Sequence, residues 1–138
     1  MEAKICYMID DDDDDRDIFE TALYNIDEHI CLLTATSGTE ALQKLSQHEN
    51  FTPDYIFVDM HMPVLDGKAC LSAIKKIERF KDVPVVMYTT SISPKDMDEA
   101  FKLGAAAYIS KPYNITTLES SLQSFFMQCN FKRRTYEY

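Results

Sequence analysis

Short apolar runs alternate with helical patterns along the whole chain, and this alternation limits the possible folds more than any other feature. A short run that is apolar throughout is typical of a strand buried on both faces, as in a parallel sheet. Each run is followed by a segment in which apolar residues recur at helical spacing. The expected strands are residues 5–9, 30–35, 55–58, 85–88 and 107–109.

Capping signals mark where several of the helices should begin. Ser37 and Glu40 form a plausible capping box, Ser93 precedes a proline, and Asn114 can cap the last helix. Gly104 is suited to the position just after the fourth helix. Five strands that alternate with five helices predict a three-layer α/β domain, with a parallel sheet covered by helices on both faces.

The 138 residues suit a single domain, expected over residues 1–128, with residues 129–138 as a polar and aromatic tail that is frayed. The first residues do not resemble a signal peptide, because a short apolar run leads directly into acidic residues. No apolar stretch approaches the ~20 residues that span a bilayer. We therefore expect a cytoplasmic protein without a membrane segment.

The chain is acidic, with a formal net charge of −9 and a pI of about 4.7. This balance argues against nucleic-acid or anionic membrane partners, whose phosphates attract lysine and arginine. It favours cations or basic protein surfaces as partners, although an acidic composition also serves solubility. The four cysteines form no C-x-x-C pair, so we expect small buried side chains in a reducing compartment.

Polar side chains directly follow four of the expected strands. Asp10 and Asp11 follow the first strand, Asp59 the third, Thr89 the fourth and Lys111 the fifth. In open parallel sheets, ligands bind beyond the carboxyl ends of the strands, where these side chains should meet. Each residue alone has an ordinary explanation, such as a solvated turn, a helix cap or a surface lysine, but their joint placement indicates a site.

The run of six aspartates from Asp10 to Asp15 allows two alternatives for the first acidic pair. Asp11 and Asp12 could form it, but the apolar run ends at Ile9, which favours Asp10 and Asp11. The later aspartates, up to Asp15, favour the positive end of the first helix and need no further role.

Three carboxylates at one edge repel one another and raise one another's pKa unless a cation joins them. Mg²⁺ prefers a few carboxylates, with water or phosphate oxygens completing its shell. A lysine and a threonine hydroxyl beside the cation supply donors to phosphate oxygens. An aspartate can then act as a nucleophile and become an aspartyl-phosphate.

Four motifs make the chain resemble the receiver domain of two-component response regulators, particularly the stand-alone chemotaxis type. They are MIDD at residues 8–11, VDMHMPVLDG at residues 58–67, PVVMYTT at residues 84–90 and GAAAYISKP at residues 104–112. The resemblance extends from about Lys4 to about Met127. It implies a flavodoxin-like, doubly wound (βα)5 fold with strand order 2-1-3-4-5.

The resemblance also implies roles for individual residues. Asp59 would be the phosphoacceptor, and Mg²⁺ would be held by Asp10, Asp11, Asp59 and the backbone carbonyl of His61. Thr89 and Lys111 would contact the phosphoryl oxygens.

Two further residues carry expectations from the resemblance. Thr89 would move toward the phosphoryl group, and Tyr108 would turn inward into the space that it leaves. The bond between Lys111 and Pro112 is expected to be cis.

The implied function is a signalling switch rather than a separate enzyme. A sensor histidine kinase or a histidine phosphotransfer protein would phosphorylate Asp59, and the chain would catalyse its own phosphorylation and dephosphorylation. A downstream protein would bind the face formed by the fourth helix, fifth strand and fifth helix, and the resemblance also allows a homodimer through this face on phosphorylation. No nucleic acid or membrane is expected as a partner.

Three other interpretations fit the residues less well. A haloacid-dehalogenase-type phosphatase needs a second acid two residues after the nucleophile, where this chain has His61. A flavin-binding carrier needs a phosphate-binding loop after the first strand, where the aspartates would repel phosphate. A degenerate receiver that acts only as a scaffold would not need the complete set of site residues.

Overall fold

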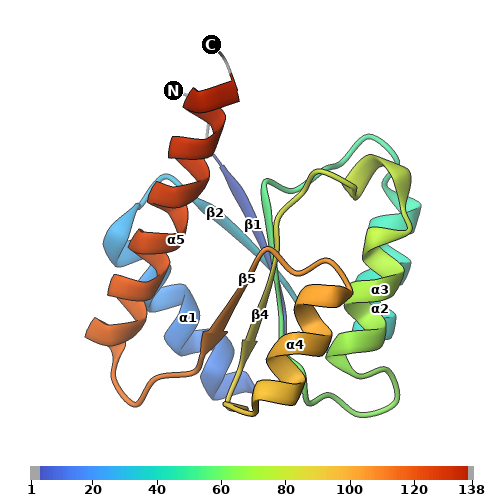
Figure 1. The fold of residues 1–138 in the computed structure, drawn as a ribbon, viewed down its shortest axis with the longest axis horizontal. Helices are drawn as coiled ribbons and strands as arrows, with labels where there is room; N and C mark the ends of the chain where they lie inside the picture. The colour runs from blue at the N-terminus through green and yellow to red at the C-terminus, as the bar shows by residue number, and fades with distance from the viewer. Residues whose placement is uncertain (1–3, 137–138) are drawn as a thin grey trace.

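Five strands form one parallel sheet in the order β2-β1-β3-β4-β5 (Figure 1). The structure is a computed structural model that describes residues 4–136, with the backbone alone for residues 131–136. The strands are β1 (Ile5–Ile9), β2 (Cys31–Ala35), β3 (Tyr55–Val58), β4 (Val85–Thr89) and β5 (Ala107–Ser110). The predicted flavodoxin-like topology is therefore confirmed.

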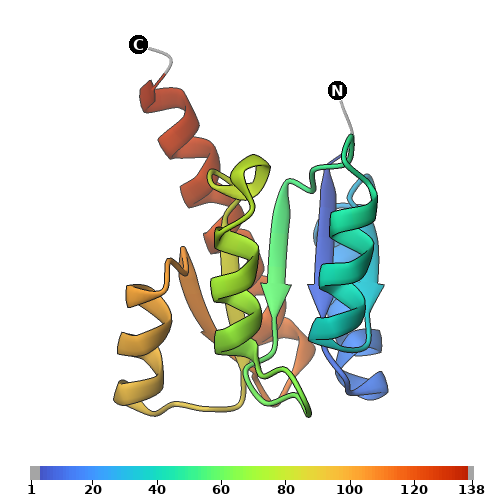
Figure 2. The same ribbon diagram turned by 90° about the vertical axis from the view of Figure 1, so that its right-hand side faces the viewer.

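Helices cover both faces of the sheet and give three layers (Figures 1 and 2). α1 and α5 pack together on one face, and α2, α3 and α4 lie on the other. The helices are α1 (Asp13–Ile26), α2 (Gly38–Gln47), α3 (Gly67–Lys75), α4 (Pro94–Lys102) and α5 (Ile115–Tyr136), and a 3₁₀ turn (Glu78–Phe80) follows α3.

The last helix is longer than the sequence indicates. α5 continues to Tyr136, so residues 129–136 extend the helix where a frayed tail was expected. Within residues 4–136, no helix is both long and apolar enough to cross a membrane.

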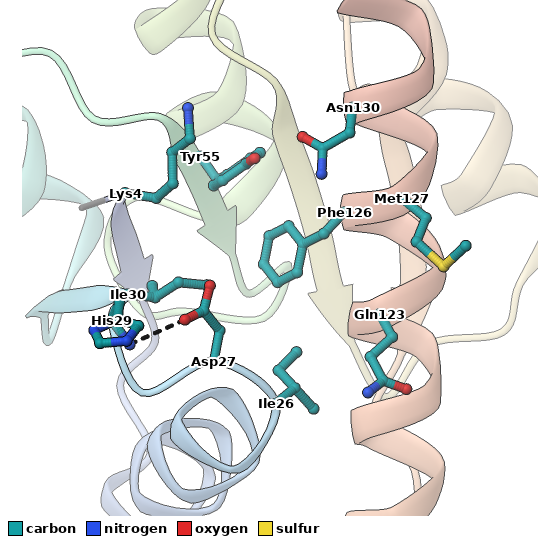
Figure 3. A pocket seen from close by; sticks show the side chains of 10 residues that line it. All are labelled: Lys4, Ile26, Asp27, His29, Ile30, Tyr55, Gln123, Phe126, Met127 and Asn130. Atoms are coloured by element: carbon teal, nitrogen blue, oxygen red, sulfur yellow. Dashed lines mark hydrogen bonds between the residues drawn. The ribbon is translucent and has the colours of Figure 1, made fainter. Parts of the chain in front are cut away.

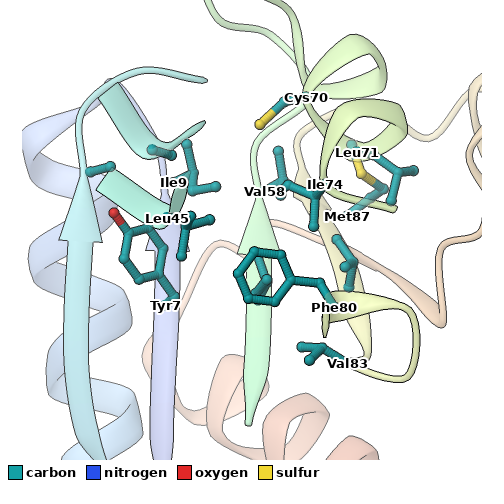
Figure 4. Close-up of a cluster of buried hydrophobic side chains, with 14 of the residues drawn as sticks. Tyr7, Ile9, Leu45, Val58, Cys70, Leu71, Ile74, Phe80, Val83 and Met87 are labelled. Carbon is teal, nitrogen blue, oxygen red and sulfur yellow. The ribbon is translucent and has the colours of Figure 1, made fainter. Parts of the chain in front are cut away.

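The sheet separates two apolar cores, which explains why its central strands are apolar on both faces. Successive residues of β1 alternate between them: Cys6 and Met8 pack with the core beneath α1 and α5, and Tyr7 and Ile9 with the core beneath α2 and α3 (Figure 4). At the edge of the sheet, β2 has one neighbour only, and Cys31 is exposed. The expectation that all cysteines are buried is wrong at this position.

The predicted N-caps are confirmed, but the capping box is only half formed, because Glu40 Oε2 accepts from the Thr36 N–H rather than from the Ser37 N–H. Ser37 Oγ accepts a hydrogen bond from the Glu40 N–H, Ser93 Oγ accepts from an N–H of α4, and Asn114 Oδ1 accepts from an N–H of α5. Asp12 caps α1 in the same way. Each such cap stabilises its helix by about 1 kcal/mol.

Backbone hydrogen bonds extend the sheet one residue beyond the strand ends. The Asp10 N–H donates to the Ala35 carbonyl at 3.1 Å, and the Asp59 N–H donates to the Ile9 carbonyl at 2.9 Å. At the other edge, the Lys111 N–H donates to the Thr89 carbonyl at 2.8 Å. The sheet itself therefore fixes the backbone of the residues that follow β1, β3 and β5.

The loop from β3 to α3 is closed by a close contact at Gly67. The Gly67 N–H donates to the Met60 carbonyl at 2.9 Å. A Cβ atom on Gly67 would collide with the Asp59 carbonyl oxygen and lie 2.5 Å from Met60 Cα. Only glycine fits here, because the colliding atoms belong to the backbone of the strand end.

We predict that Gly67→Ala lowers the free energy of unfolding by about 2–3 kcal/mol, because the new methyl group must displace rigid backbone. Gly38→Ala is the matched control: its Cβ would lie 3.0 Å from Leu65 Cδ2, the end of a flexible side chain, and 3.2 Å from the Leu65 carbonyl oxygen, so it needs only a small shift. Urea denaturation of both variants measures the difference. Equal unfolding midpoints for Gly67→Ala and the wild type would contradict the tight packing of the loop.

Candidate functional site

Three carboxylates meet at the carboxyl edge of the sheet. Oxygens of Asp10, Asp11 and Asp59 all lie within 4.8 Å of one another. Asp10 is fully buried, Asp59 is 6% exposed, and Asp11 is open to solvent. The remaining candidate, Asp12, caps α1 instead, so the structure gathers Asp10 and Asp11 rather than Asp11 and Asp12.

Lys111 reaches into this cluster from the end of β5. Its Nζ lies 2.8 Å from Asp10 Oδ2, 2.7 Å from Asp15 Oδ2 and 3.5 Å from Asp59 Oδ2. The lysine side chain is only 9% exposed. The contact with Asp15 was missed, because nothing in the run of aspartates distinguishes this residue from its neighbours.

Burial and charge shift the titration of these groups. The pKa of Asp10 is raised to about 6, mainly because the carboxyl group is buried. The contact with Lys111 and the hydrogen bond from the Asp12 N–H act in the opposite direction and lower this pKa. Burial also raises the pKa of Asp59, again opposed by Lys111. Burial disfavours the charged form of Lys111, but its contacts with Asp10 and Asp15 outweigh this and raise its pKa. One lysine thus faces an excess of buried negative charge.

The donor set fits a hard divalent cation. Asp10 Oδ2 is buried, and its partner in the described part of the chain is the Lys111 ammonium at 2.8 Å, which also contacts Asp15 and Asp59. Carboxylate oxygens are the ligands that Mg²⁺ prefers. The backbone N–H of His61 donates to Asp59 Oδ1 at 3.4 Å. A role of the His61 carbonyl as a ligand stays a prediction.

Thr89 and Tyr108 are joined through Ser91 in the loop from β4 to α4. Thr89 is fully buried, and its Oγ1 accepts a hydrogen bond from the Ser91 N–H at 3.4 Å. The half-buried Tyr108 packs against the core beneath α2 and α3, and its hydroxyl donates to the Ser91 carbonyl at 3.0 Å. The structure therefore already holds the Tyr108 ring inward.

The predicted cis bond between Lys111 and Pro112 is wrong, since every peptide bond in the described part of the chain is trans. A trans bond is the usual form even before proline. Here Lys111 is directed by its backbone hydrogen bond to Thr89 and by its ion pairs with Asp10 and Asp15.

A cavity of about 990 Å³ lies at the opposite edge of the sheet, between the end of α1 and α5 (Figure 3). Phe126 of α5 projects into it, facing the segment with Asp27 and His29, where the His29 N–H donates to Asp27 Oδ1 at 3.0 Å. The ionisable residues of its lining, Lys4, Asp27 and His29, do not form a cluster of metal-ligating side chains. The chemistry of the side chains, rather than cavity size, therefore identifies the acidic edge as the candidate site.

Comparison with known proteins agrees with this geometry. The profile of the response regulator receiver domain matches residues 6–123. The sensor histidine kinase CheAY of Helicobacter pylori is 36% identical over 110 residues, which are 80% of this chain and 13% of that protein.

Two solved structures are also similar. The phosphorylated cyanobacterial phytochrome response regulator RcpA has a TM-score of 0.81 and 29% identity, over 90% of this chain and 91% of that one. The Mn²⁺-bound form of the response regulator Rcp1 has a TM-score of 0.77 and 27% identity, over 88% of this chain and 90% of that one.

The chain spans only 13% to 57% of the length of the first four curated relatives it matches. The match to the receiver profile nevertheless covers most of this chain, from β1 into α5. With the parallel sheet of order 2-1-3-4-5 and the acidic cluster at its carboxyl edge, the chain belongs to the response regulator receiver domain family of two-component signalling.

Proposed function

We propose that this chain acts as a single-domain response regulator that accepts a phosphoryl group on Asp59 and then changes a protein-binding face. The observation that carries the proposal is the convergence of Asp10, Asp11 and Lys111 on the nearly buried Asp59 carboxylate. The likeness to RcpA, which covers 91% of that chain, supports the view that a receiver of this length acts by itself.

The proposed reaction is a phosphoryl transfer from a phosphohistidine of a sensor histidine kinase or a histidine phosphotransfer protein. A carboxylate oxygen of Asp59 forms the new bond to phosphorus, and the bond from phosphorus to the histidine nitrogen breaks, leaving its electron pair on nitrogen. Later hydrolysis restores the carboxylate. Apart from this self-catalysed cycle, the chain is not proposed to be an enzyme.

The residues around Asp59 would each contribute to this transfer. Lys111, 3.5 Å from Asp59 Oδ2, would pair with a phosphoryl oxygen, and the Thr89 hydroxyl would donate to another. Mg²⁺ would be held by Asp10, Asp11, Asp59 and the His61 carbonyl, and when bound it supplies positive charge that offsets the charge of the transferred group.

The face formed by α4, β5 and α5 is the proposed output surface. Ile92, just before α4, is 78% exposed, Phe101 on α4 is 48% exposed, and Tyr113, just before α5, is fully exposed. Large apolar side chains that remain exposed on or next to these elements favour protein contacts. A downstream protein is the proposed partner, and the same face would also allow a homodimer on phosphorylation. The acidic net charge disfavours nucleic acid and membrane partners.

The proposal predicts that the purified chain gains one phosphoryl group from acetyl phosphate in the presence of Mg²⁺, as measured by intact mass. Asp59→Asn should gain none, because it lacks the nucleophile, and neither should the wild type without Mg²⁺. Asp14→Asn, which removes the same charge from an exposed position in α1, is the control and should behave as the wild type. A folded wild-type protein that gains nothing and does not bind beryllofluoride would support the scaffold interpretation instead.

The buried charge predicts how stability depends on pH without Mg²⁺. The pKa of Asp10 is 3.8 in its ordinary state and about 6 in the folded protein, so the folded state binds more protons between these values. The contribution of Asp10 to stability is therefore greatest below about pH 4 and is lost as the pH rises through about 6. Near pH 7, Asp10→Asn should raise the free energy of unfolding by about 1–3 kcal/mol, because the amide does not carry the charge that burial disfavours.

Urea denaturation at about pH 7 and about pH 4 measures this effect, with Asp14→Asn again as the control. The gain from Asp10→Asn should shrink toward zero at the lower pH. Added Mg²⁺ should stabilise the wild type by binding to the folded state and should stabilise Asp10→Asn less. A stability difference that is independent of both pH and Mg²⁺ would contradict the proposed electrostatics.

A further inference from the structure

A second charged cluster lies beside the acidic site and connects α3 to α4. Lys68, in the first turn of α3, donates from Nζ to Asp96 Oδ1 at 2.8 Å and to a carboxylate oxygen of Glu99. The side chains of Lys68 and Asp96 are 26% and 23% exposed, so solvent screens this contact only in part. Lys68 and Asp96 are 28 residues apart in sequence, and their contact joins α3 to α4.

Asp96 also contacts Ser91, so the ion pair with Lys68 helps to fix the position of Ser91. Asp96 Oδ2 accepts a hydrogen bond from Ser91 Oγ at 2.7 Å, and Ser91 Oγ in turn accepts from the Ser93 N–H at 3.3 Å. The backbone of Ser91 is also engaged: its N–H donates to Thr89 Oγ1, and its carbonyl accepts from the Tyr108 hydroxyl. The hydroxyl, N–H and carbonyl of Ser91 thus all have partners, and together they fix its position.

The position of Ser91 determines which hydrogen bonds the Thr89 hydroxyl can make. Thr89 is fully buried, and its oxygen already accepts from the Ser91 N–H. Among the residues with described side chains, this hydroxyl donates to no acceptor, and a buried donor without an acceptor is costly. A phosphoryl oxygen on Asp59 would provide that acceptor.

Lys68 is also tied to the backbone next to Asp59. It directly follows Gly67, whose N–H donates to the Met60 carbonyl and which lies so close to the strand end that a Cβ atom on it would collide with the Asp59 carbonyl oxygen. The Lys68–Asp96 pair therefore links the loop after Asp59 to the loop after Thr89, and these loops flank the site of phosphorylation.

We propose that Lys68 and Asp96 are positioning residues for phosphoryl transfer, which act through Ser91. Ser91 holds the Thr89 hydroxyl ready to donate to a phosphoryl oxygen, and it also holds the Tyr108 hydroxyl at the β4–α4 loop. This inference rests on the proposed function of Asp59. Because coupling between two sites is reciprocal, a group bound at Asp59 also strengthens the Lys68–Asp96 contact.

The test uses the full chain with Mg²⁺ and beryllofluoride, a phosphoryl mimic, and isothermal titration calorimetry. Lys68→Met should weaken beryllofluoride binding about threefold to tenfold, the range expected for a partly exposed ion-pair network. Lys95→Met is the matched control, because Lys95 lies 4.0 Å from the same Glu99 and is 82% exposed. It should change binding less than about twofold, as should Lys68→Arg, which keeps the charge.

Two further readouts separate positioning from a general structural effect. The affinity for Mg²⁺ alone should be the same in the wild type and Lys68→Met, because the three carboxylates do not contact Lys68. In protein labelled with 3-fluorotyrosine, the ¹⁹F resonance of Tyr108, assigned with Tyr108→Phe, should shift in ligand-free Lys68→Met and not in Lys95→Met.

The outcomes distinguish this inference from the proposed function. A wild-type protein that does not bind beryllofluoride overturns the proposed function of Asp59, and the ligand-free Tyr108 resonance still tests the link from Lys68. Wild-type binding with equal affinities for Lys68→Met and Lys95→Met overturns the inference alone. An unmoved Tyr108 resonance in Lys68→Met also overturns it.

Discussion

Lys111 brings together carboxylates from three separate parts of the chain, and the geometry of the acidic edge depends on this one cation. It extends from β5 and contacts Asp10 after β1, Asp15 in α1 and Asp59 after β3. Without a charge of this sign, the buried carboxylates would repel one another and raise one another's pKa further. One ammonium group cannot neutralise all of them, and the remaining negative charge is what makes the edge suitable for a divalent cation.

The sheet divides the molecule into two halves that differ in the contacts they contain. The core beneath α1 and α5 consists of tightly packed aromatic and aliphatic side chains, such as Phe19 and Phe57, whose ring centroids are 4.9 Å apart. The other core contains Tyr108 at its margin and lies beneath the helices that carry Lys68 and Asp96. The contacts that connect α3, α4 and the β4–α4 loop are therefore gathered in the second half, whereas the first half is a packed support.

The sequence was sufficient to predict the helices and strands and the polar residues that directly follow the strands, because burial and capping are local patterns. Asp59 and Lys111 could be placed at one edge because parallel strands end together. The contacts of Asp15 with Lys111 and of Lys68 with Asp96 could not be predicted, since each depends on the rotation of a helix about its axis and on the distance between two elements far apart in sequence. The trans bond after Lys111 is the ordinary form of a peptide bond, and the cis expectation came from the resemblance alone.

The hydrogen bond from Gly67 to Met60 closes the β3–α3 loop into a ring of fixed size beside Asp59. Such a ring cannot gain or lose a residue without displacing the carboxylate, so its length is as constrained as its chemistry. The loop at the opposite edge, around Glu49 and Asn50, is exposed and makes no contact with the acidic cluster. For protein engineering, this means that an inserted epitope or reporter belongs at the amino-terminal edge of the sheet, where chain length can vary without altering the acidic site.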